Sequence, residues 1–449
     1  MSLTPAKKQR AEPAVGHLTN RLSEWYLAVC LVGLLTEGVF MAQIQPIVAQ
    51  GPRAIFGFMI LRGFPSEYYF CTIGLAIGLV AVVRSRRTWH VPLMGKGLLL
   101  VWVLVFGGGA FYGRLRGNDW WEADLRAALQ CMIILPWASV LVQNVNLGVV
   151  FKRFMWAAVP LAIVNGLMGI AFVGRLSGAS SNGTLWTDGW VGNYILILVF
   201  LLAFARSITH DRQGILPMSI VVFGICAGLG KPSLVTLFIG MTIIALLALW
   251  LGRTNNSVRL QKMMSSGMVL LFVGSGVAIL VCSIDKDSVI SFLRRRFLKV
   301  DSNADLSTGR LEMWQECLKI WSEQPLLGSG LGLKLRTPGA TTKSLAIHNY
   351  AVQTLMQTGI IGFTGVAAVV ILWLRRALKS LRIEPDPEML WVRLGLISFM
   401  CTMLVAMMYG DVIFSTTVAF VIWFAIVFET YAHSRLLCGP SRSRQALQL

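Results

Sequence analysis

Apolar runs of the length that crosses a bilayer recur along almost the whole chain. They start near Trp25 and end near Tyr431, which is far more than one anchor or one signal peptide would need. The runs occupy residues 25–44, 68–83, 98–112, 125–142, 154–173, 190–205, 216–229, 234–251, 263–282, 350–374, 390–408 and 412–431. This pattern predicts an all-α polytopic membrane protein with about twelve transmembrane helices.

Basic residues mark every second connection between these runs. Because Lys and Arg collect in short cytoplasmic loops, the alternation places the N-terminus and the connections that contain Arg84, Arg206 and Arg375 in the cytoplasm. A short apolar stretch at 54–64 preserves this alternation only if it is interfacial or re-entrant. The remaining connections are then external.

The same pattern divides the chain into five parts. We expect a cytoplasmic leader at 1–23 that is not cleaved, a bundle of nine helices at 24–282, a large external loop containing short helices at 283–347, three more helices at 348–432, and a basic cytoplasmic tail at 433–449.

Composition supports this class and removes others. Hydrophobic residues make up 55% of the chain and charged residues 14%, so an ordinary soluble globule is excluded. The net charge of +19 reflects loop residues that set orientation, and no basic and aromatic stripe suited to nucleic acid is present. The long external loop is itself basic. It suits an anionic lipid partner, although a solvated basic face explains it equally well.

His348 is the first candidate for chemistry, because it stands where the long loop becomes a helix. Helical spacing places Gly359 and Gly362 on its face, so we expect a second helix to pack closely there and hold the histidine. The helix N-terminus disfavours its protonated form, which suits a general base acting on a sugar hydroxyl. The alternative is a structural histidine at the interface.

Arg310 lies in the first turn of a helix predicted to begin after a cap at Ser307 and to end at Pro325. It shares a face with Trp314 and Trp321, so it could grip a pyrophosphate by a bidentate contact or stack on tryptophan. The glycines at 328, 330 and 332 lack the GK[ST] sequence of a phosphate loop and predict a tight turn instead.

Other charged residues lie at membrane ends. Lys231 interrupts an apolar hairpin, where a lysine either snorkels or binds an anion, and Arg114 and Arg116 lie in another external connection. Asp285 and Asp287 form a DxD pair that either binds a divalent metal or arises by chance. Cys282 directly precedes the long loop and Cys317 lies within it, and a disulfide between them is left open.

These motifs resemble one family. "HN", nine residues and "GIIG", preceded by "STGR" and "PLLGSGLG", are similar to the bacterial O-antigen ligase and polymerase family, above all to its ligase branch. The resemblance implies an inner-membrane glycosyltransferase whose active site faces the periplasm. Its donor would be an undecaprenyl pyrophosphate-linked glycan and its acceptor lipid A-core oligosaccharide.

The resemblance also implies roles for the candidates. Transfer would be inverting, without metal or other cofactor, with His348 as the base and Arg310 on the donor pyrophosphate. Lys231 stands where the family usually carries arginine. From their external position, we expect Arg114 or Arg116 to help hold the donor. An O-antigen polymerase or a protein O-oligosaccharyltransferase would use the same donor. A lipid-linked glycan transporter is the rival from another class, although the polar residues gather on one external face.

Overall fold

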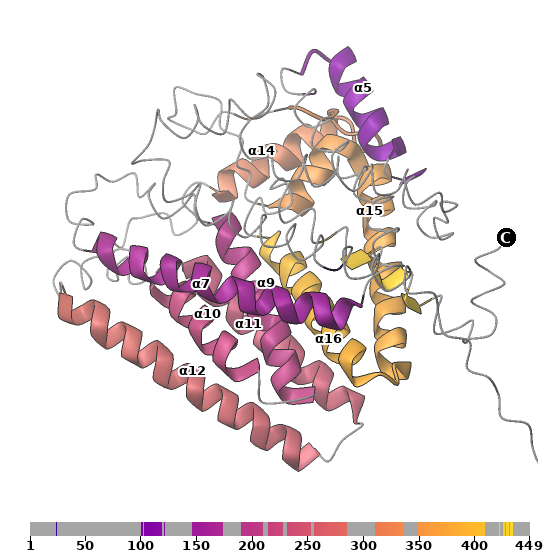
Figure 1. Ribbon diagram of the computed structural model, residues 1–449. Coiled ribbons are helices and arrows are strands. Elements are labelled where there is room, and N and C mark those ends of the chain that lie inside the picture. Colours follow the sequence, from indigo (N-terminus) through magenta and orange to yellow (C-terminus); the bar gives the residue numbers. More distant parts are fainter. Residues whose placement is uncertain are drawn as a thin grey trace, which may run out of the picture.

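The computed structural model describes residues 24, 100–101, 103–118, 121, 146–173, 190–209, 214–227, 231–252, 256–284, 310–333, 335, 349–408, 422, 425–426, 428–430 and 432–433. All regular elements in these ranges are helices, and they contain no strand. The predicted all-α class is therefore confirmed for the part of the chain that the structure describes (Figure 1).

Where the structure describes most residues of a predicted span, a helix is present there. In chain order they are η2 (Val103–Gly107), a π-helical turn, α5 (Gly108–Leu115), α7 (Leu147–Val173), α9 (Trp190–Thr209), α10 (Ile215–Ala227), α11 (Lys231–Leu251), α12 (Asn256–Ile284), α14 (Arg310–Glu323), α15 (Tyr350–Ile383) and α16 (Pro387–Ala406). The predicted spans at 25–44, 68–83 and 125–142 and the stretch at 54–64 lie outside the described residues.

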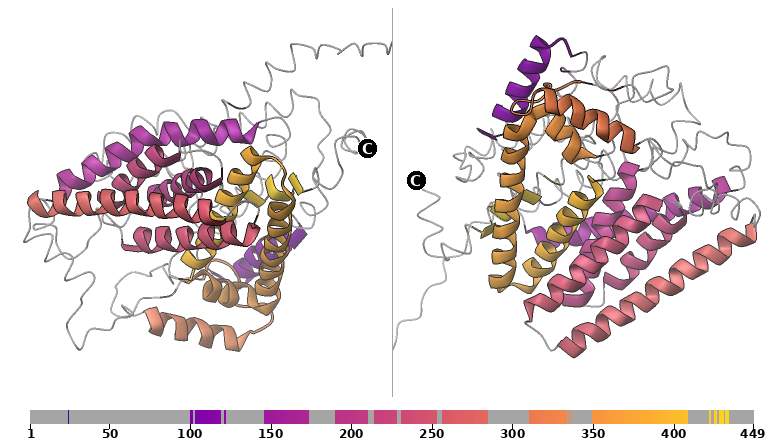
Figure 2. Two further views of the ribbon diagram at one scale, coloured as in Figure 1. Left: turned by 90° about the horizontal axis from the view of Figure 1, so that it is seen from below. Right: turned by 180° about the vertical axis from the view of Figure 1, so that it is seen from behind.

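Two of these helices, α15 and α16, are long and apolar enough to cross a membrane by length and composition. Their surroundings differ, because 78% of the most apolar window of α16 is buried but only 28% of that of α15. Helix α15 runs along the edge of the bundle in Figures 1 and 2. The predicted total of about twelve spans stays a prediction.

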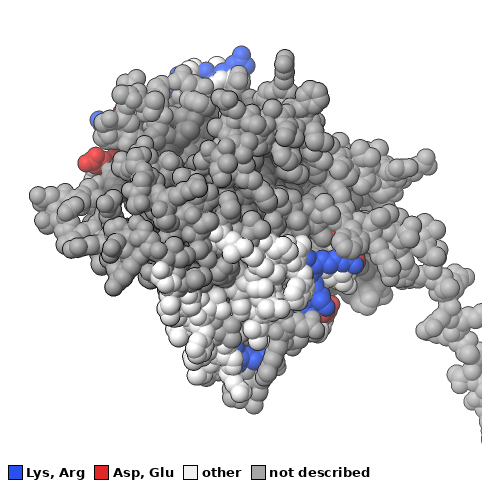
Figure 3. All heavy atoms as spheres, turned by 60° about the vertical axis from the view of Figure 1, so that its left-hand side comes forward, with Lys and Arg blue, Asp and Glu red and all other residues white. Residues whose placement is uncertain are grey.

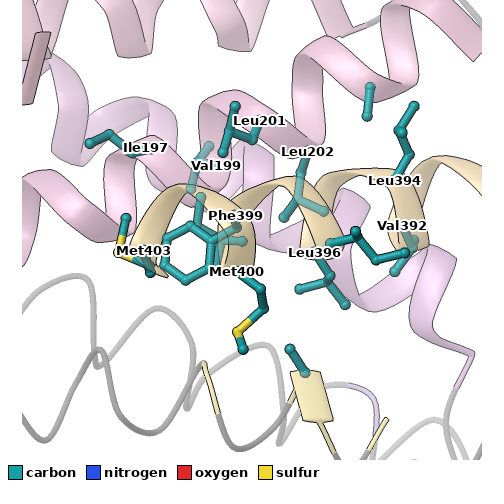
Figure 4. Packing of buried hydrophobic residues seen from close by; sticks show 14 of the residues in the cluster. Ile197, Val199, Leu201, Leu202, Val392, Leu394, Leu396, Phe399, Met400 and Met403 are labelled. Carbon is teal, nitrogen blue, oxygen red and sulfur yellow. The ribbon is translucent and has the colours of Figure 1, made fainter. Parts of the chain in front are cut away.

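The core of the bundle forms around α9. Every residue from 196 to 205 is buried, and the helix packs between α7, α10, α11 and α16. Figure 4 shows Leu202 of α9 lying against the ribbon of α16. Gly395 permits this approach, since a Cβ there would lie 2.8 Å from the Cδ2 atom of Leu202. A helix that is apolar all round belongs in such a central position.

The outer surface of the bundle is also apolar. Helix α12 exposes a row of large side chains, namely Met264, Met268, Leu271, Phe272 and Ile279. Figure 3 views one side of the molecule, where the described residues form a mostly uncharged surface with Lys and Arg at its margins. Exposed apolar surface of this extent is typical of a protein that contacts membrane.

A buried ionic cluster joins the ends of α15 and α16. Arg393 is 1% exposed, and its guanidinium donates to Glu384 (Nε to Oε2, 2.7 Å) and to the Glu429 carboxylate. Beside them, Ser380 Oγ lies 2.6 Å from His433 Nδ1. The predicted topology would place this end of α15 in the cytoplasm, on the opposite side from the predicted site. The contacts themselves make the cluster a structural clasp between helices.

Removing the cation of this cluster should destabilise the protein strongly. Arg393→Met would leave two buried carboxylates uncompensated, which typically costs about 3–5 kcal/mol. We expect a clearly lower melting temperature in detergent. Arg375→Met, at an exposed arginine of α15, should change the melting temperature little. Adding Glu384→Gln and Glu429→Gln to Arg393→Met should restore part of the loss. Equal melting temperatures for Arg393→Met and wild type would show that the cluster is not a clasp.

Candidate functional site

Helix α15 is broken at Gly359. The residue has φ 63° and ψ −169°, a conformation that essentially only glycine adopts. Residues 350–358 and 360–383 therefore form two helical segments that meet at a kink. The expectation that Gly359 lies on one continuous helical stripe beside a second helix is wrong. Its backbone is not helical, and the backbone that packs against it belongs to the loop after α14.

The loop after α14 is inserted into this break. In an unbroken helix, the amide of Ile360 would donate to the carbonyl of Met356 and the amide of Ile361 to that of Gln357. All four groups bond to the loop instead. The bonds are Ser329 N to Met356 O (2.8 Å), Gly330 N to Gln357 O (2.9 Å), Ile360 N to Pro325 O (2.9 Å) and Ile361 N to Leu326 O (3.3 Å). The loop thus supplies every hydrogen bond that these backbone groups lose.

Glycines allow the two backbones to approach this closely. A Cβ at Gly359 would overlap the carbonyl group of Leu326, and one at Gly328 would lie 2.5 Å from the amide nitrogen of Gly359. Gly328, Gly330 and Gly332 all have positive φ. The tight turn predicted from the glycine cluster is therefore confirmed, and its role is to reach into α15.

Helix α5 holds the loop from the other side. Leu331 N donates to Gly109 O at 2.9 Å, and Tyr112 Oη donates to Gln324 Oε1 at 2.9 Å. The side-chain amide of Asn118 donates to three successive carbonyl oxygens of the loop. They belong to Ser329 (3.1 Å), Gly330 (3.3 Å) and Leu331 (2.9 Å). We call the assembly of residues 108–118, 324–333 and 356–362 the junction.

Two of the predicted donor contacts sit on this junction. Arg114 and Arg116 lie at the end of α5 and are exposed. The Arg114 guanidinium is 5.2 Å from the centre of the Trp121 ring, and that of Arg116 is 5.8 Å from the Tyr112 ring. Both cations are therefore stacked on aromatic rings, yet they keep exposed surface that an anion can reach.

Helix α14 packs against the first segment of α15. Met313 and Cys317 are buried, and Cys317 forms a small core with Met356. The helix ends at Glu323, before Pro325, as predicted. A disulfide between Cys282 and Cys317 does not form, because Cys317 is a free thiol. Arg310 is the first residue of α14, and its side chain lies outside the described residues.

Burial raises the pKa of the Cys317 thiol to about 12, and the nearby Glu316 carboxylate adds to the rise. The contribution of the neutral thiol to stability is therefore complete below pH 9 and is lost as the pH rises from 9 towards 12.

We expect Cys317 to resist maleimide at pH 8 in the native protein and to react after denaturation. Mass spectrometry of the peptide that contains Cys317 measures this. Rapid native labelling would contradict the burial.

The predicted base precedes the cap of α15. Asn349 Oδ1 accepts from Val352 N at 3.2 Å, and Tyr350 N donates to Met407 O at 2.8 Å, beside the end of α16. His348 itself lies outside the described residues, so its role stays a prediction. One turn further on, Gln353 is 6% exposed, and its side-chain oxygen has no hydrogen-bond partner among the residues that the structure describes. Sequence reasoning did not single out this buried amide.

Within the part of the chain that the structure describes, no other predicted site residue except Gly362 lies at the junction. Lys231 is the first residue of α11, which packs mainly on α9 and α16, and its side chain lies outside the described part. Asp285 and Asp287 also lie outside it. Gly362 is buried, and a Cβ there would overlap the Thr358 side chain and lie 3.2 Å from Val105 Cγ1. Its small size therefore serves the kink and the contact with η2.

A protein-family model described as O-antigen ligase matches residues 197–367. This part of the chain is similar to the O-antigen ligase family. The O-antigen ligase region extends from α9 into α15 and so includes more than the motifs that suggested it. Lys231, Arg310, His348, Gly359 and Gly362 lie inside it, whereas Arg114 and Arg116 precede it. No curated protein matches the chain. The family is membrane-associated and consists of glycosyltransferase-like ligases.

Proposed function

We propose that this protein is an O-antigen ligase of the bacterial inner membrane, acting at the periplasmic face in lipopolysaccharide biosynthesis. It transfers O-antigen glycan from undecaprenyl pyrophosphate to lipid A-core oligosaccharide, with inversion and without a metal or other cofactor. The observation that supports this best is the O-antigen ligase match over residues 197–367. The junction supports it further, because it joins α14, which begins at Arg310, to the helix that follows His348.

In the proposed reaction, an acceptor sugar hydroxyl attacks the anomeric carbon of the donor glycan. Neutral His348 takes the hydroxyl proton as the new carbon–oxygen bond forms. The bond between the anomeric carbon and the pyrophosphate oxygen breaks, and undecaprenyl pyrophosphate leaves with the bonding electron pair. Because the leaving group is already a stabilised anion, one base and a set of cations are sufficient.

Arg310 is the proposed main contact of the donor pyrophosphate, with Lys231, Arg114 and Arg116 as further cations. Helix α14 packs on Met356, and the loop that follows α14 is inserted into α15. These contacts fix the position of the helix that carries Arg310. The bonds from α5 to the same loop hold Arg114 and Arg116 against the same unit. A clamp built on such rigid elements keeps its geometry as charge develops.

The clamp is tested by substitution at Arg310. A hydrogen bond to a charged group contributes about 1.5–3 kcal/mol, so losing it should raise the KM for the donor by roughly ten- to a hundredfold in Arg310→Ala. Arg310→Lys should recover part of the affinity, since lysine keeps the charge and loses the planar fork. Lys319→Ala, at an exposed position on α14, is the control. An unchanged donor KM in Arg310→Ala, with the protein folded, would remove Arg310 from the clamp.

A further inference from the structure

Four exposed apolar side chains gather at the break in α15. Leu326 and Leu327 on the loop are 62% and 57% exposed, and Ile360 and Ile361 on the helix are 44% and 57% exposed. They are neighbours, because Leu326 O accepts from Ile361 N and Pro325 O from Ile360 N. No charged residue occurs in the sequence from Gln324 to Leu333. Such a cluster is unusual on a loop exposed to water.

The position of the break along α15 places this cluster at membrane depth. Arg375 opens the basic end of the helix, sixteen residues after Gly359. At about 1.5 Å per residue the break lies roughly 24 Å from Arg375. The hydrocarbon layer is about 30 Å thick, so with Arg375 at its inner boundary the break falls inside the outer leaflet. A tilt of the helix would place it deeper still.

The cluster also continues a surface that faces lipid. Helix α15 has most of its apolar window unburied, and Ile371 and Leu372 are 63% and 55% exposed further along it. The polar groups of the loop backbone are also paired, as a segment that leaves water requires. Its amides at Ser329, Gly330 and Leu331 and its carbonyls at Pro325 and Leu326 are hydrogen-bonded to α15 or α5. Irregular backbone is tolerated at membrane depth where it is buried in protein. Gly328, Ser329 and Gly330 are buried, and the amides of Ser329 and Gly330 donate to α15.

We infer that residues 325–330, with the adjoining turn of α15, are seated in the acyl-chain region of the outer leaflet. The segment predicted as a wholly external loop at 283–347 then contains a re-entrant element, and α14 lies where lipid headgroups begin. The bilayer hydrocarbon is the partner that covers Leu326, Leu327, Ile360 and Ile361. This inference does not depend on the reaction that the protein catalyses.

The test measures which collision partner reaches the loop. Full-length protein carrying Leu327→Cys is labelled with a nitroxide and reconstituted in phosphatidylethanolamine and phosphatidylglycerol vesicles. Power-saturation EPR then compares collisions with oxygen, which partitions into lipid, and with a water-soluble nickel complex. Leu372→Cys serves as the lipid reference and Ser322→Cys, on exposed α14, as the water reference. Unsubstituted protein carried through labelling corrects for native cysteines.

The label at residue 327 should give an oxygen-to-nickel collision ratio close to that at residue 372 and severalfold above that at residue 322. A ratio like that at residue 322 would put the loop in water and overturn the inference. Low collision with both agents would mean that protein, such as a second copy of the chain, covers the loop, and would overturn it too. If Leu327→Cys does not fold, Leu326→Cys is measured in its place, because that side chain is equally exposed.

Discussion

Replacement of His348 by alanine is expected to lower the rate of glycan transfer by about a hundred- to ten-thousandfold. The acceptor hydroxyl is a weak nucleophile until its proton is taken, and His348 is the proposed base. The residue that follows it, Asn349, caps α15 through Val352 N, so the backbone of the cap does not depend on the imidazole. The variant should therefore insert and fold while its kcat falls.

Transfer is measured with purified protein in detergent, and melting temperature and elution volume report folding. Thr364→Ala, at an exposed position of the same helix, is the control and should keep its activity. The KM for the donor should change little in His348→Ala, which separates a base from a donor contact. A variant with wild-type kcat would show that His348 is structural and that the proposed mechanism is wrong.

Gly359→Ala is expected to disrupt the junction. The backbone conformation at this residue costs a non-glycine residue about 1–3 kcal/mol, and the new Cβ would lie 2.6 Å from the amide nitrogen of Gly328. The atoms in the way are backbone atoms, so no side chain can rotate aside. The loop must withdraw, which leaves four backbone groups of the break without their hydrogen-bond partners. The total loss should reach about 3 kcal/mol or more.

The matched control for this change is Gly365→Ala on the same helix. A Cβ at Gly365 would make only ordinary contacts, at 3.4 Å from Val101 Cγ1 and 3.7 Å from Val105 Cγ2. We expect Gly359→Ala to melt well below wild type and to lose most transfer, and Gly365→Ala to match wild type in both. If the two alanine variants behave alike, the break in α15 is not required for the fold or for the site.

Hydrophobic pattern alone was sufficient to predict the apolar helices that the structure describes, because a bilayer-length apolar run has few other stable forms. The predicted end of α14 before Pro325 and the tight turn at the glycine cluster are also confirmed, since proline and glycine restrict the backbone locally. Local chemistry of this kind is readable from one sequence.

The junction was not predictable in the same way. The spacing of Gly359 and Gly362 fits an unbroken helical stripe, and nothing nearby in the sequence shows that a loop supplies the missing hydrogen bonds. Asn118 bonds to a carbonyl 211 residues later in the chain. Contacts of this kind depend on tertiary packing, which a single sequence does not encode in any local pattern. His348, Arg310 and Lys231 were singled out because polar groups at membrane ends are costly and therefore few. Their roles stay predictions, since their side chains lie outside the described residues.

The most direct measurement is transfer by purified wild-type protein in the presence of EDTA. The donor is a defined undecaprenyl pyrophosphate-linked glycan, and lipid A-core, a second donor molecule and an unfolded protein are offered as separate acceptors. The account predicts glycan-bearing lipid A-core as the product, with undecaprenyl pyrophosphate released in equal amount. Transfer only to a second donor or to protein, loss of all transfer in EDTA, or no transfer to any acceptor would contradict the assignment as a metal-independent O-antigen ligase.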